Sequence, residues 1–324
     1  MRMGRQFQLQ ESSYDHAEIS GDHVALVIPT LNAADHLDSL LLALRAQSFR
    51  PATFLVVDSS STDGSPERLS AAGAEVVAIP RSQFDHGGTR QLAVDRLSPE
   101  IEIIIFLTQD ALPAEDDAIA RLVAAFADPE VGVAYGRQMP RLDSSEIGAH
   151  ARLFNYPDES MKLRPDVATD AGVKATFCSN SFAAYRRKAL EMVGGFPSGT
   201  IFGEDAAVAG RMLLSGWAKA YVSEARVYHS HDYSLGQEFR RYFDVGVMHA
   251  RAPWLLECFG GAGGEGRRFV QSELRHLARH RPSAIPSAIL RNAIKFAAYH
   301  CGRSEARIPR PVKRRISLNR RYWE

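Results

Sequence analysis

The 324-residue sequence predicts an α/β fold, in which a mostly parallel sheet is flanked by helices and followed by a C-terminal helical extension. Short apolar runs alternate with amphipathic segments through the first half of the chain, which is typical of a parallel sheet covered on both faces. From about residue 234 onward the pattern is helical. With 45% hydrophobic and 24% charged residues, the composition is that of a globular protein and excludes disordered and fibrous classes.

The first half of the chain contains four predicted strands, each short and apolar as a strand buried on both faces should be. They are Val24–Thr30, Thr53–Asp58, Glu75–Ile79 and Glu102–Leu107. Between the first two, the leucines of residues 37–44 recur at helical spacing, and Asn32 is a candidate cap for that helix. A second helix is expected at Ser65-Pro66, where proline suits the first helical position, and a third after Gly87-Gly88.

The second half of the chain has a less regular pattern. Residues 136–174 are rich in loop-forming residues, and Ala175–Tyr185 is expected to be extended. A helix is predicted from Gly203 through Leu214, followed by a strand at Ala220–His231. The glycines of residues 260–266 have the GxGxxG spacing of a dinucleotide-binding loop. Because they follow a helix rather than a strand, we interpret them as a flexible linker.

The sequence carries no targeting signal that we can identify. Residues 1–22 are polar and lack the apolar stretch of a signal peptide, so we interpret them as a leader to the folded part. No apolar run approaches the roughly 20 residues that cross a bilayer. The three cysteines, Cys178, Cys258 and Cys301, are scattered, which suits a reducing compartment. We therefore expect a cytoplasmic protein, with peripheral association at the inner face of the membrane as an option.

Positive charge gathers at the C-terminal end of the chain. Residues 267–324 carry fifteen Lys and Arg against three Glu, a net charge of +12, which leaves −11 on the rest because the total is +1. Such a tail suits an anionic membrane surface, or is simply solvated. Nucleic acid is disfavoured as a partner because base-stacking aromatics are not interleaved with the charges.

Residues 287–299 read as a basic amphipathic helix within that tail. Ile289, Ala293 and Phe296 fall on one face, while Arg291 and Lys295 fall on another. Such a helix can lie in a membrane interface. Packing on the core, or on a second subunit of a homo-oligomer, is an equal alternative.

Charged side chains follow several of the predicted strands. Asp58 ends one predicted strand, His86 lies in the loop after the next, and Asp110 follows the fourth. In such sheets ligands bind outside the carboxyl ends of the strands. Asp58 is placed to accept a pyrimidine N3–H, or else belongs to a structural turn. Asp110 is a candidate ligand for an oxygen-seeking divalent cation, or else a helix cap.

Three further groups complete the candidate site. Gly87, next to Arg90, can bring backbone amides to a phosphate. Glu204 and Asp205 open a helix, where one is a candidate general base or both complement the helix dipole. His229 and His231, two apart on a strand, point the same way and are candidate contacts to a metal or diphosphate, although a single histidine is more often structural.

Taken together, these segments resemble glycosyltransferase family 2, the inverting enzymes with a Rossmann-like GT-A fold. The matching motifs are VIPTLNA at 27–33, VVDSSSTDGS at 56–65, TQDA at 108–111 and GEDAAVAGRMLLSGWAKAYVSEARVYHSH at 203–231. Within the family, FDHGGTR at 84–90 and HSHDYSLGQEFRRYFDVGV at 229–247 look most similar to bacterial rhamnosyltransferases, which build O-antigen or other cell-wall polysaccharides from dTDP-L-rhamnose.

The resemblance implies a catalytic domain at residues 23–233, with a nucleotide half at about 23–135 and an acceptor half at about 136–233, followed by a helical segment at 234–324. It implies transfer of L-rhamnose to a hydroxyl of a glycan or lipid-linked acceptor. A UDP-sugar or GDP-sugar donor, or a catalytically silent nucleotide-binding module, are the alternatives.

The resemblance also implies roles for individual residues. The nucleotide would be bound by a set of residues that comprises Pro29, Thr30, Asp58, His86, Gly87, Arg90 and Gln109. Asp110, helped by His229 or His231, would hold Mg²⁺ or Mn²⁺ against the diphosphate. Asp205 would be the catalytic base, and Glu204 would orient it or contact the acceptor. The chain departs from the family where Thr108 or Gln109 replaces the first acid of the usual Asp-x-Asp motif.

Overall fold

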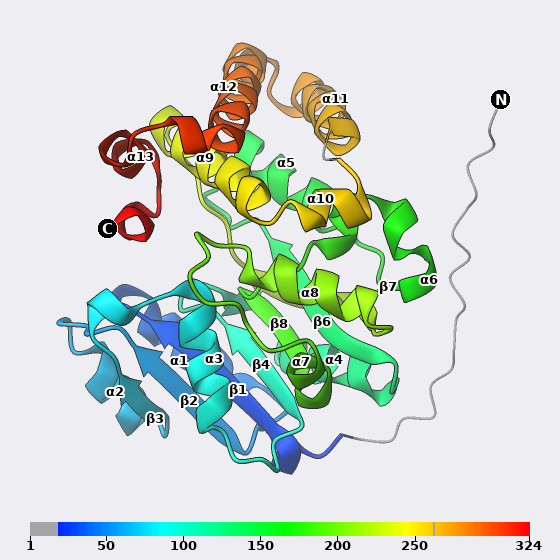
Figure 1. Cartoon of the computed structure of the whole chain (residues 1–324). Coiled ribbons are helices and arrows are strands. Elements are labelled where there is room, and N and C mark those ends of the chain that lie inside the picture. The colour runs from blue at the N-terminus through cyan, green and yellow to red at the C-terminus, as the bar shows by residue number, and fades with distance from the viewer. Residues whose placement is uncertain (1–18, 262) are drawn as a thin grey trace.

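The computed structural model describes residues 19–261 and 263–324 (Figure 1). Within them, one nine-stranded sheet has the order β3-β2-β1-β4-β8-β6-β9-β5, and β7 pairs with β9 off this path. The strands are β1 Val24–Thr30, β2 Thr53–Asp58, β3 Glu75–Ala78, β4 Ile103–Leu107, β5 Leu112–Pro113, β6 Val131–Met139, β7 Met161–Leu163, β8 Phe182–Arg186 and β9 Ala218–Tyr228.

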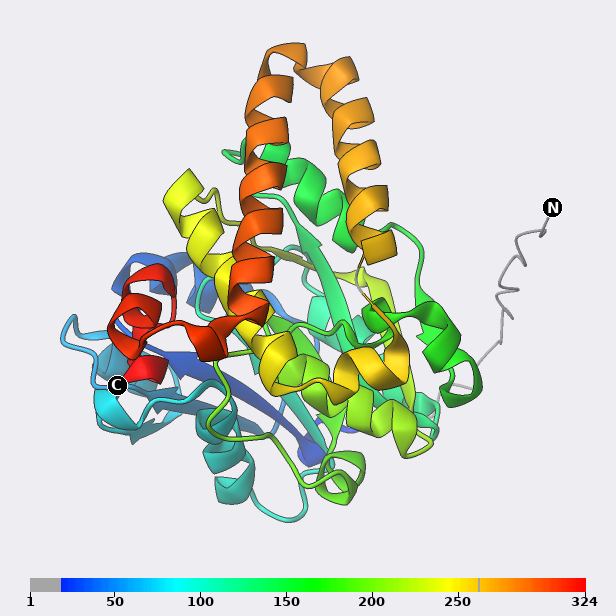
Figure 2. The ribbon, with the colours of Figure 1, turned by 45° about the horizontal axis from the view of Figure 1, so that its top comes forward.

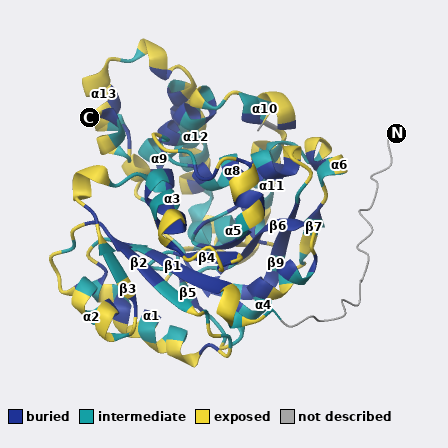
Figure 3. Ribbon diagram, turned by 60° about the horizontal axis from the view of Figure 1, so that its bottom comes forward, coloured by how far each residue is buried: buried dark blue, intermediate teal, exposed yellow. Residues whose placement is uncertain are grey.

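Helices cover both faces of the sheet. The apolar side chains of α1 Ala34–Ala46, α2 Ser65–Ala71 and α4 Ala118–Ala124 pack on one face. Those of α3 His86–Arg96, α7 Arg187–Met192 and α8 Glu204–Leu214 pack on the other. The central strands are accordingly buried (Figure 3). This layering confirms the predicted α/β fold.

The sheet is parallel in one part and mixed in the other. β1 pairs in parallel with both β2 and β4, and β2 pairs in parallel with β3. β8 is antiparallel to β4 and β6, whereas β6 and β9 are parallel. Because β8 runs in reverse, its amino end lies at the sheet edge where β1, β2 and β4 end. The segment before β8 therefore reaches the same edge as the predicted site residues.

The predicted boundaries need correction at two helix starts. Asn32 does not cap α1: its φ is 48°, and its side-chain oxygen accepts the Thr62 amide at 3.0 Å. Asp63 instead accepts the Ala34 amide at 2.8 Å. The third helix begins at His86, before the glycine pair, because the carboxylate of Asp85 caps it. The free amides at the start of each helix are thus satisfied by a carboxylate, which comes from a distant segment at α1 and from the preceding residue at α3.

The second half contains more regular structure than predicted. Residues 136–174 include the end of β6, β7, and the helices α5 Glu146–Asn155 and α6 Pro165–Ala168. Residues 173–176 form a 3₁₀ turn rather than extended chain, and β8 begins only at Phe182. β9 ends at Tyr228, so His229 and His231 follow the strand.

The C-terminal helices are α9 Leu235–Arg251, α10 Trp254–Phe259, α11 Gly263–His280, α12 Ile285–Arg303 and α13 Arg310–Ile316. α11 begins at Gly263, so much of the glycine cluster is helical rather than a linker; residue 262, and the leader up to residue 18, lie outside the described residues. In the described part of the chain, no helix combines the length and apolarity needed to cross a membrane.

α9 and α12 pack closely, and α11 and α12 form a hairpin that extends from the body (Figure 2). A Cβ at Gly246 of α9 would lie 2.2 Å from the Tyr299 carbonyl, and one at Gly302 of α12 would lie 2.0 Å from that of Phe243. Glycine therefore permits the helices to touch at these two positions. The chain then returns through α13 to the α9 surface, where Trp323 is buried near Phe243.

Candidate active site

The carboxyl ends of β1, β2 and β4 are joined by side-chain hydrogen bonds. The Asp58 carboxylate, almost fully buried, accepts the Thr30 hydroxyl at 3.0 Å and both the hydroxyl and the amide of Ser61. The Gln109 side chain bonds both backbone groups of Leu31, accepting at 2.8 Å and donating at 3.1 Å. Pro29, which pairs with Val57, is half-buried beside them. Gln109 thus ties the metal-motif segment to the end of β1.

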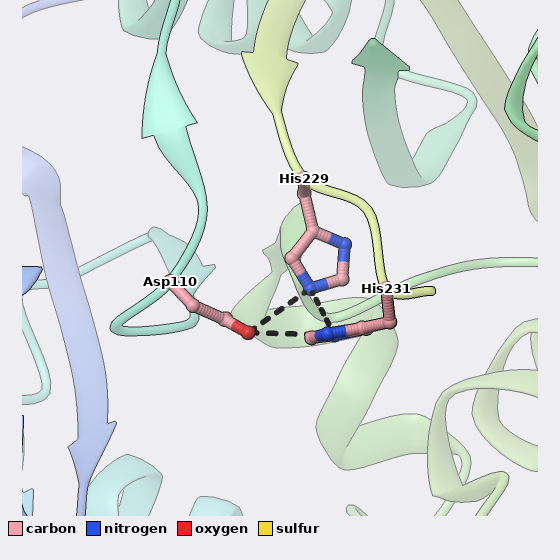
Figure 4. A group of neighbouring side chains, drawn as sticks. All are labelled: Asp110, His229 and His231. Atoms are coloured by element: carbon pink, nitrogen blue, oxygen red, sulfur yellow. Dashed lines mark hydrogen bonds and ion pairs between the residues drawn. The ribbon is translucent and has the colours of Figure 1, made fainter. Parts of the chain in front are cut away.

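Asp110, His229 and His231, the Asp110 triad, converge just beyond β4 and β9 (Figure 4). Oδ2 of Asp110 lies 3.4 Å from Nε2 of each histidine, and the two Nε2 atoms lie 3.1 Å apart. All three are potential ligand atoms within 4.8 Å of one another. Ligands in adjacent positions of an octahedral ion with bonds of about 2.1 Å lie roughly 3 Å apart, so these separations suit a shared cation.

Gln138, at the end of β6, fixes which nitrogen of His229 faces the triad. Its side-chain oxygen accepts from Nη1 of Arg152 at 2.6 Å, and an arginine can only donate. The same oxygen lies 2.9 Å from Nδ1 of His229, which must therefore carry the proton. The Nε2 lone pair is left directed at Asp110. Support of this kind orients histidine ligands in metal sites.

The protonation of the triad is compatible with cation binding. Burial would raise the pKa of Asp110, but its polar neighbours, the two histidines and Thr108, hold it well below its ordinary value. Burial and the neighbouring His229 lower the pKa of His231 to about 4. At neutral pH the carboxylate is ionised and His231 is neutral, as metal ligands must be.

Glu204 and Asp205 form a second cluster at the start of α8. Glu204 is buried, lies 3.1 Å from Nη1 of Arg90 and accepts the Asn180 side-chain amide at 3.0 Å. Burial would raise its pKa, but Arg90 and His86 bring the pKa of Glu204 below its ordinary value. Asp205 accepts the Asn180 backbone amide at 3.2 Å. Burial, and then the charge of Glu204, raise the pKa of Asp205 to about 7.

A chain of hydrogen bonds links the Asp110 triad to Glu204 and Asp205, although in the described part of the molecule the two clusters are not bonded to each other directly. Gln138 also donates to the Ser179 hydroxyl at 2.8 Å, and the next residue, Asn180, holds both carboxylates of α8. Within the described chain, no hydrogen bond or ion pair joins Asp205 to a member of the Asp110 triad. The segment 179–181, which leads into the reversed strand β8, therefore links the Asp110 triad to the acidic pair of α8 through Gln138, Ser179 and Asn180.

Three predicted nucleotide-site residues have structural partners of their own. Arg90 is buried and bonds both Glu204 and the His86 carbonyl. Burial lowers the pKa of His86, whose Nε2 lies 3.4 Å from the Asn319 side-chain oxygen. A Cβ at Gly87 would lie 1.8 Å from the Pro197 carbonyl, so packing alone requires this glycine.

The sequence pattern missed Gln138, Arg152, Asn180 and Asn319. Each is a polar residue in a segment where hydrophobic periodicity gives no sign of function. Asn180 lay inside the segment predicted to be extended, so its position just before β8 could not be read from the sequence.

Comparison with known proteins identifies the family of this chain. Residues 25–194 match the model of glycosyl transferase family 2. An O-antigen chain rhamnosyltransferase of Salmonella typhimurium is 43% identical over 93% of this chain and 96% of its own. Another, of Salmonella anatum, is 41% identical over 92% of this chain and 95% of its own. An N-acetylglucosaminyl-diphospho-decaprenol L-rhamnosyltransferase of Mycobacterium tuberculosis is 27% identical over 80% of this chain and 97% of its own.

Solved structures show the same fold. A mannosyltransferase of Pyrobaculum calidifontis has a TM-score of 0.56 at 19% identity, covering 97% of this chain and 88% of its own. S. aureus TarS has a TM-score of 0.51 at 14% identity, covering 88% of this chain and 91% of its own. The molecule is a glycosyltransferase with the GT-A fold. The chain belongs to glycosyltransferase family 2, and the predicted similarity to bacterial rhamnosyltransferases is confirmed.

Proposed function

We propose that this enzyme transfers L-rhamnose from dTDP-L-rhamnose, with inversion, to a hydroxyl of a glycan acceptor during O-antigen synthesis. The similarity to the two Salmonella rhamnosyltransferases, at 43% and 41% identity over nearly the whole chain, carries the proposal. The acceptor would be a lipid-linked glycan bearing a diphosphate, as the name of the mycobacterial relative describes for that enzyme.

We propose that the Asp110 triad holds a divalent cation. The spacing of its ligand atoms, the ionised carboxylate and the fixed tautomer of His229 fit such an ion. Two nitrogen ligands and one oxygen ligand favour Mn²⁺ over Mg²⁺, which prefers oxygen. The archaeal mannosyltransferase with this fold was solved with Mn²⁺. When bound, the ion would supply positive charge to the diphosphate leaving group.

Asp205 is the proposed catalytic base. It would take the proton of the acceptor hydroxyl as that oxygen bonds the anomeric carbon, while the bond from that carbon to the diphosphate oxygen breaks. Burial, and then the charge of Glu204 beside Arg90, raise the pKa of Asp205 toward neutrality, where a base is most effective. Asn180 would position both carboxylates.

Asp58, Thr30 and Pro29 are proposed to line the nucleoside pocket. A carboxylate has about four acceptor positions, so Asp58 can accept a thymine N3–H besides its bonds to Thr30 and Ser61. Gln109 would contribute indirectly, since it holds the backbone of Leu31. His86, Gly87 and Arg90 would shape the site by packing and charge.

A donor panel tests the proposed function. Purified enzyme with Mn²⁺ and a lipid-linked acceptor extract is supplied with dTDP-L-rhamnose, UDP-sugars and GDP-sugars, and nucleotide release is measured. We expect acceptor-dependent release from dTDP-L-rhamnose at least tenfold above the others. Equal or greater turnover of a UDP-sugar or GDP-sugar would contradict the rhamnose assignment, and no turnover of any donor would contradict the enzyme assignment.

We further propose that the enzyme binds the inner membrane face through the α11–α12 hairpin. The apolar face of α12, not its basic face, would meet the membrane. Arg291 and Lys295 face the body, where they lie 2.9 Å and 3.5 Å from Glu238 of α9. Ile289, Leu290 and Phe296 are exposed instead. An exposed apolar ridge on α12, in a hairpin whose other helix carries arginines, suits a membrane interface.

Co-sedimentation with phosphatidylglycerol vesicles tests the membrane proposal. Replacing Ile289 and Phe296 by serine should abolish binding that the wild type shows. Vesicle binding by this variant equal to that of the wild type would contradict the membrane proposal. Concentration-dependent dimerisation of the wild type that is lost in the variant would also contradict it, because the apolar ridge would then be an interface between two copies of the chain.

A further inference from the structure

A cationic hollow lies on the C-terminal segment, outside the catalytic cluster. It has a volume of about 1090 Å³ and is formed by α9, α13 and the 3₁₀ turn Arg320–Trp323. It is lined by Pro311, Trp323, Glu324 and six arginines, which are Arg240, Arg310, Arg314, Arg315, Arg320 and Arg321. We name it the arginine hollow.

The charge of the hollow is largely uncompensated. Arg314 lies 3.1 Å from the carboxylate of Glu324. Across residues 19–261 and 263–324, Arg240, Arg315 and Arg320 have no carboxylate within ion-pair distance. Several like charges around one cavity create a positive potential that attracts an anion. All six cations are arginines, whose planar forks bind phosphate oxygens in pairs.

The hollow is built on buried contacts and is not a loose tail. The Asp244 carboxylate, fully buried on α9, accepts the backbone amides of Leu318 and Asn319 at 3.0 Å each. Trp323 is buried, and Nζ of Lys313 lies 4.7 Å from its ring centre. The segment that carries Arg315 and Arg320 is thus fixed on both sides.

Direct contacts connect the hollow to the active site. Asn319, next to Arg320, reaches His86, and Nη1 of Arg321 donates to the Arg81 carbonyl at 2.7 Å. On α9, Arg241 follows Arg240 and lies 4.1 Å from the ring centre of Phe202, which shortly precedes Glu204. These contacts join the segment that carries the hollow to the start of α3 and to the loop before α8.

We propose that the arginine hollow is a second phosphate site, which binds the diphosphate of the acceptor rather than that of the donor. The donor diphosphate is proposed to lie at the Asp110 triad, beside the cation that the triad would hold, whereas the hollow offers positive charge without a metal ion. The volume accommodates a diphosphate and the groups attached to it. The identity of the acceptor rests on the proposed function; the phosphate site itself does not.

Calorimetry with inorganic pyrophosphate, in EDTA to silence the metal site, tests the proposal. The variant is Arg315→Ala/Arg320→Ala, and its control, Arg267→Ala/Arg275→Ala, removes the same charge from α11. We expect the hollow variant to bind pyrophosphate at least tenfold more weakly than the wild type, and the control to bind within twofold of it. No binding by the wild type, equal binding by the hollow variant, or an equal loss in the control would overturn the proposal.

Two further measurements distinguish a soluble diphosphate from a membrane phosphate, and the proposal for the hollow from the proposed function. Binding to phosphatidylglycerol vesicles should persist in the hollow variant; loss of vesicle binding with pyrophosphate binding intact would assign these arginines to membrane phosphates and overturn the proposal. Thermal stabilisation by dTDP-L-rhamnose with Mn²⁺ should also persist. Donor turnover without a pyrophosphate site contradicts only this inference, and a pyrophosphate site without donor turnover contradicts only the proposed function.

Discussion

The side-chain oxygen of Gln138 lies 2.9 Å from Nδ1 of His229 and so directs the opposite nitrogen of that ring at Asp110. Arg152 fixes the orientation of the Gln138 amide. The geometry of the Asp110 triad thus depends on a residue that is not itself a ligand. If the triad holds a metal, its affinity must depend on Gln138.

Replacing Gln138 by methionine, which cannot accept the hydrogen bond, should weaken Mn²⁺ binding by about 10- to 100-fold. Electron paramagnetic resonance of free Mn²⁺ in titrations of the metal-free protein measures this. Gln138→Glu is the matched control, since it retains an acceptor and should bind Mn²⁺ at least as tightly as the wild type. A methionine variant with wild-type affinity would contradict the positioning role.

Asp110→Asn should remove the charged ligand of the triad and lower both Mn²⁺ affinity and transfer by about 100-fold or more, because an amide oxygen binds such ions far more weakly than a carboxylate. EDTA should inactivate the wild type, and added Mn²⁺ should restore it. Full activity of the wild type after metal removal would show that the triad is not needed as a metal site.

Asp205→Asn should lower kcat by about 10²- to 10⁴-fold, because the acceptor proton loses its recipient. Donor affinity, measured by thermal stabilisation with dTDP-L-rhamnose, should stay within a few-fold of the wild type. Near-normal turnover in this variant would show that another group is the base.

The pKa of Asp205, raised to about 7 by burial and by Glu204, predicts the pH dependence of transfer. The base acts only when deprotonated, so kcat/KM should be constant above about pH 8 and fall tenfold per pH unit below pH 7. Removing the charge of Glu204 with Glu204→Gln should shift this limb to lower pH. A profile of the wild type that stays flat down to pH 5 would be inconsistent with Asp205 as the base.

Gly87→Ala should destabilise the fold by about 1–3 kcal/mol, because the added Cβ would overlap the Pro197 carbonyl 1.8 Å away. Denaturant unfolding measures the change. Gly236→Ala, at a helical position with open space, is the control and should be neutral or slightly stabilising. If Gly87→Ala reduced donor binding without changing stability, the glycine would act on the nucleotide rather than in packing.

Much of the sheet could be predicted because its strands depend on local sequence patterns. Continuous apolar runs identified β1 and β2 residue for residue, since strands buried on both faces need apolar side chains at every position. The predicted placement of Asp58 and Asp110 near one sheet edge followed from the shared carboxyl edge of parallel strands. The predicted cap, Asn32, was wrong because the carboxylate that accepts the Ala34 amide belongs to Asp63, in another part of the chain.

The orientation of α12 shows what local pattern leaves open. Its amphipathic sequence distinguishes an apolar face from a basic face but does not say which one faces the body. Glu238, on α9, draws Arg291 and Lys295 inward and leaves Phe296 exposed. The usual rule that the apolar face is buried fails here because two cations find a buried carboxylate.

The fold class, the family motifs and the residue types of the candidate site could be read from local patterns, since these depend on periodicity and on short segments. The tertiary structure decided which of those residues meet: that three ligand atoms converge beyond β4 and β9, that Gln138 selects the tautomer of a histidine 91 residues away, and that Arg90 serves Glu204. Side-chain contacts between distant segments are set by how helices and strands pack, and no local pattern encodes that geometry.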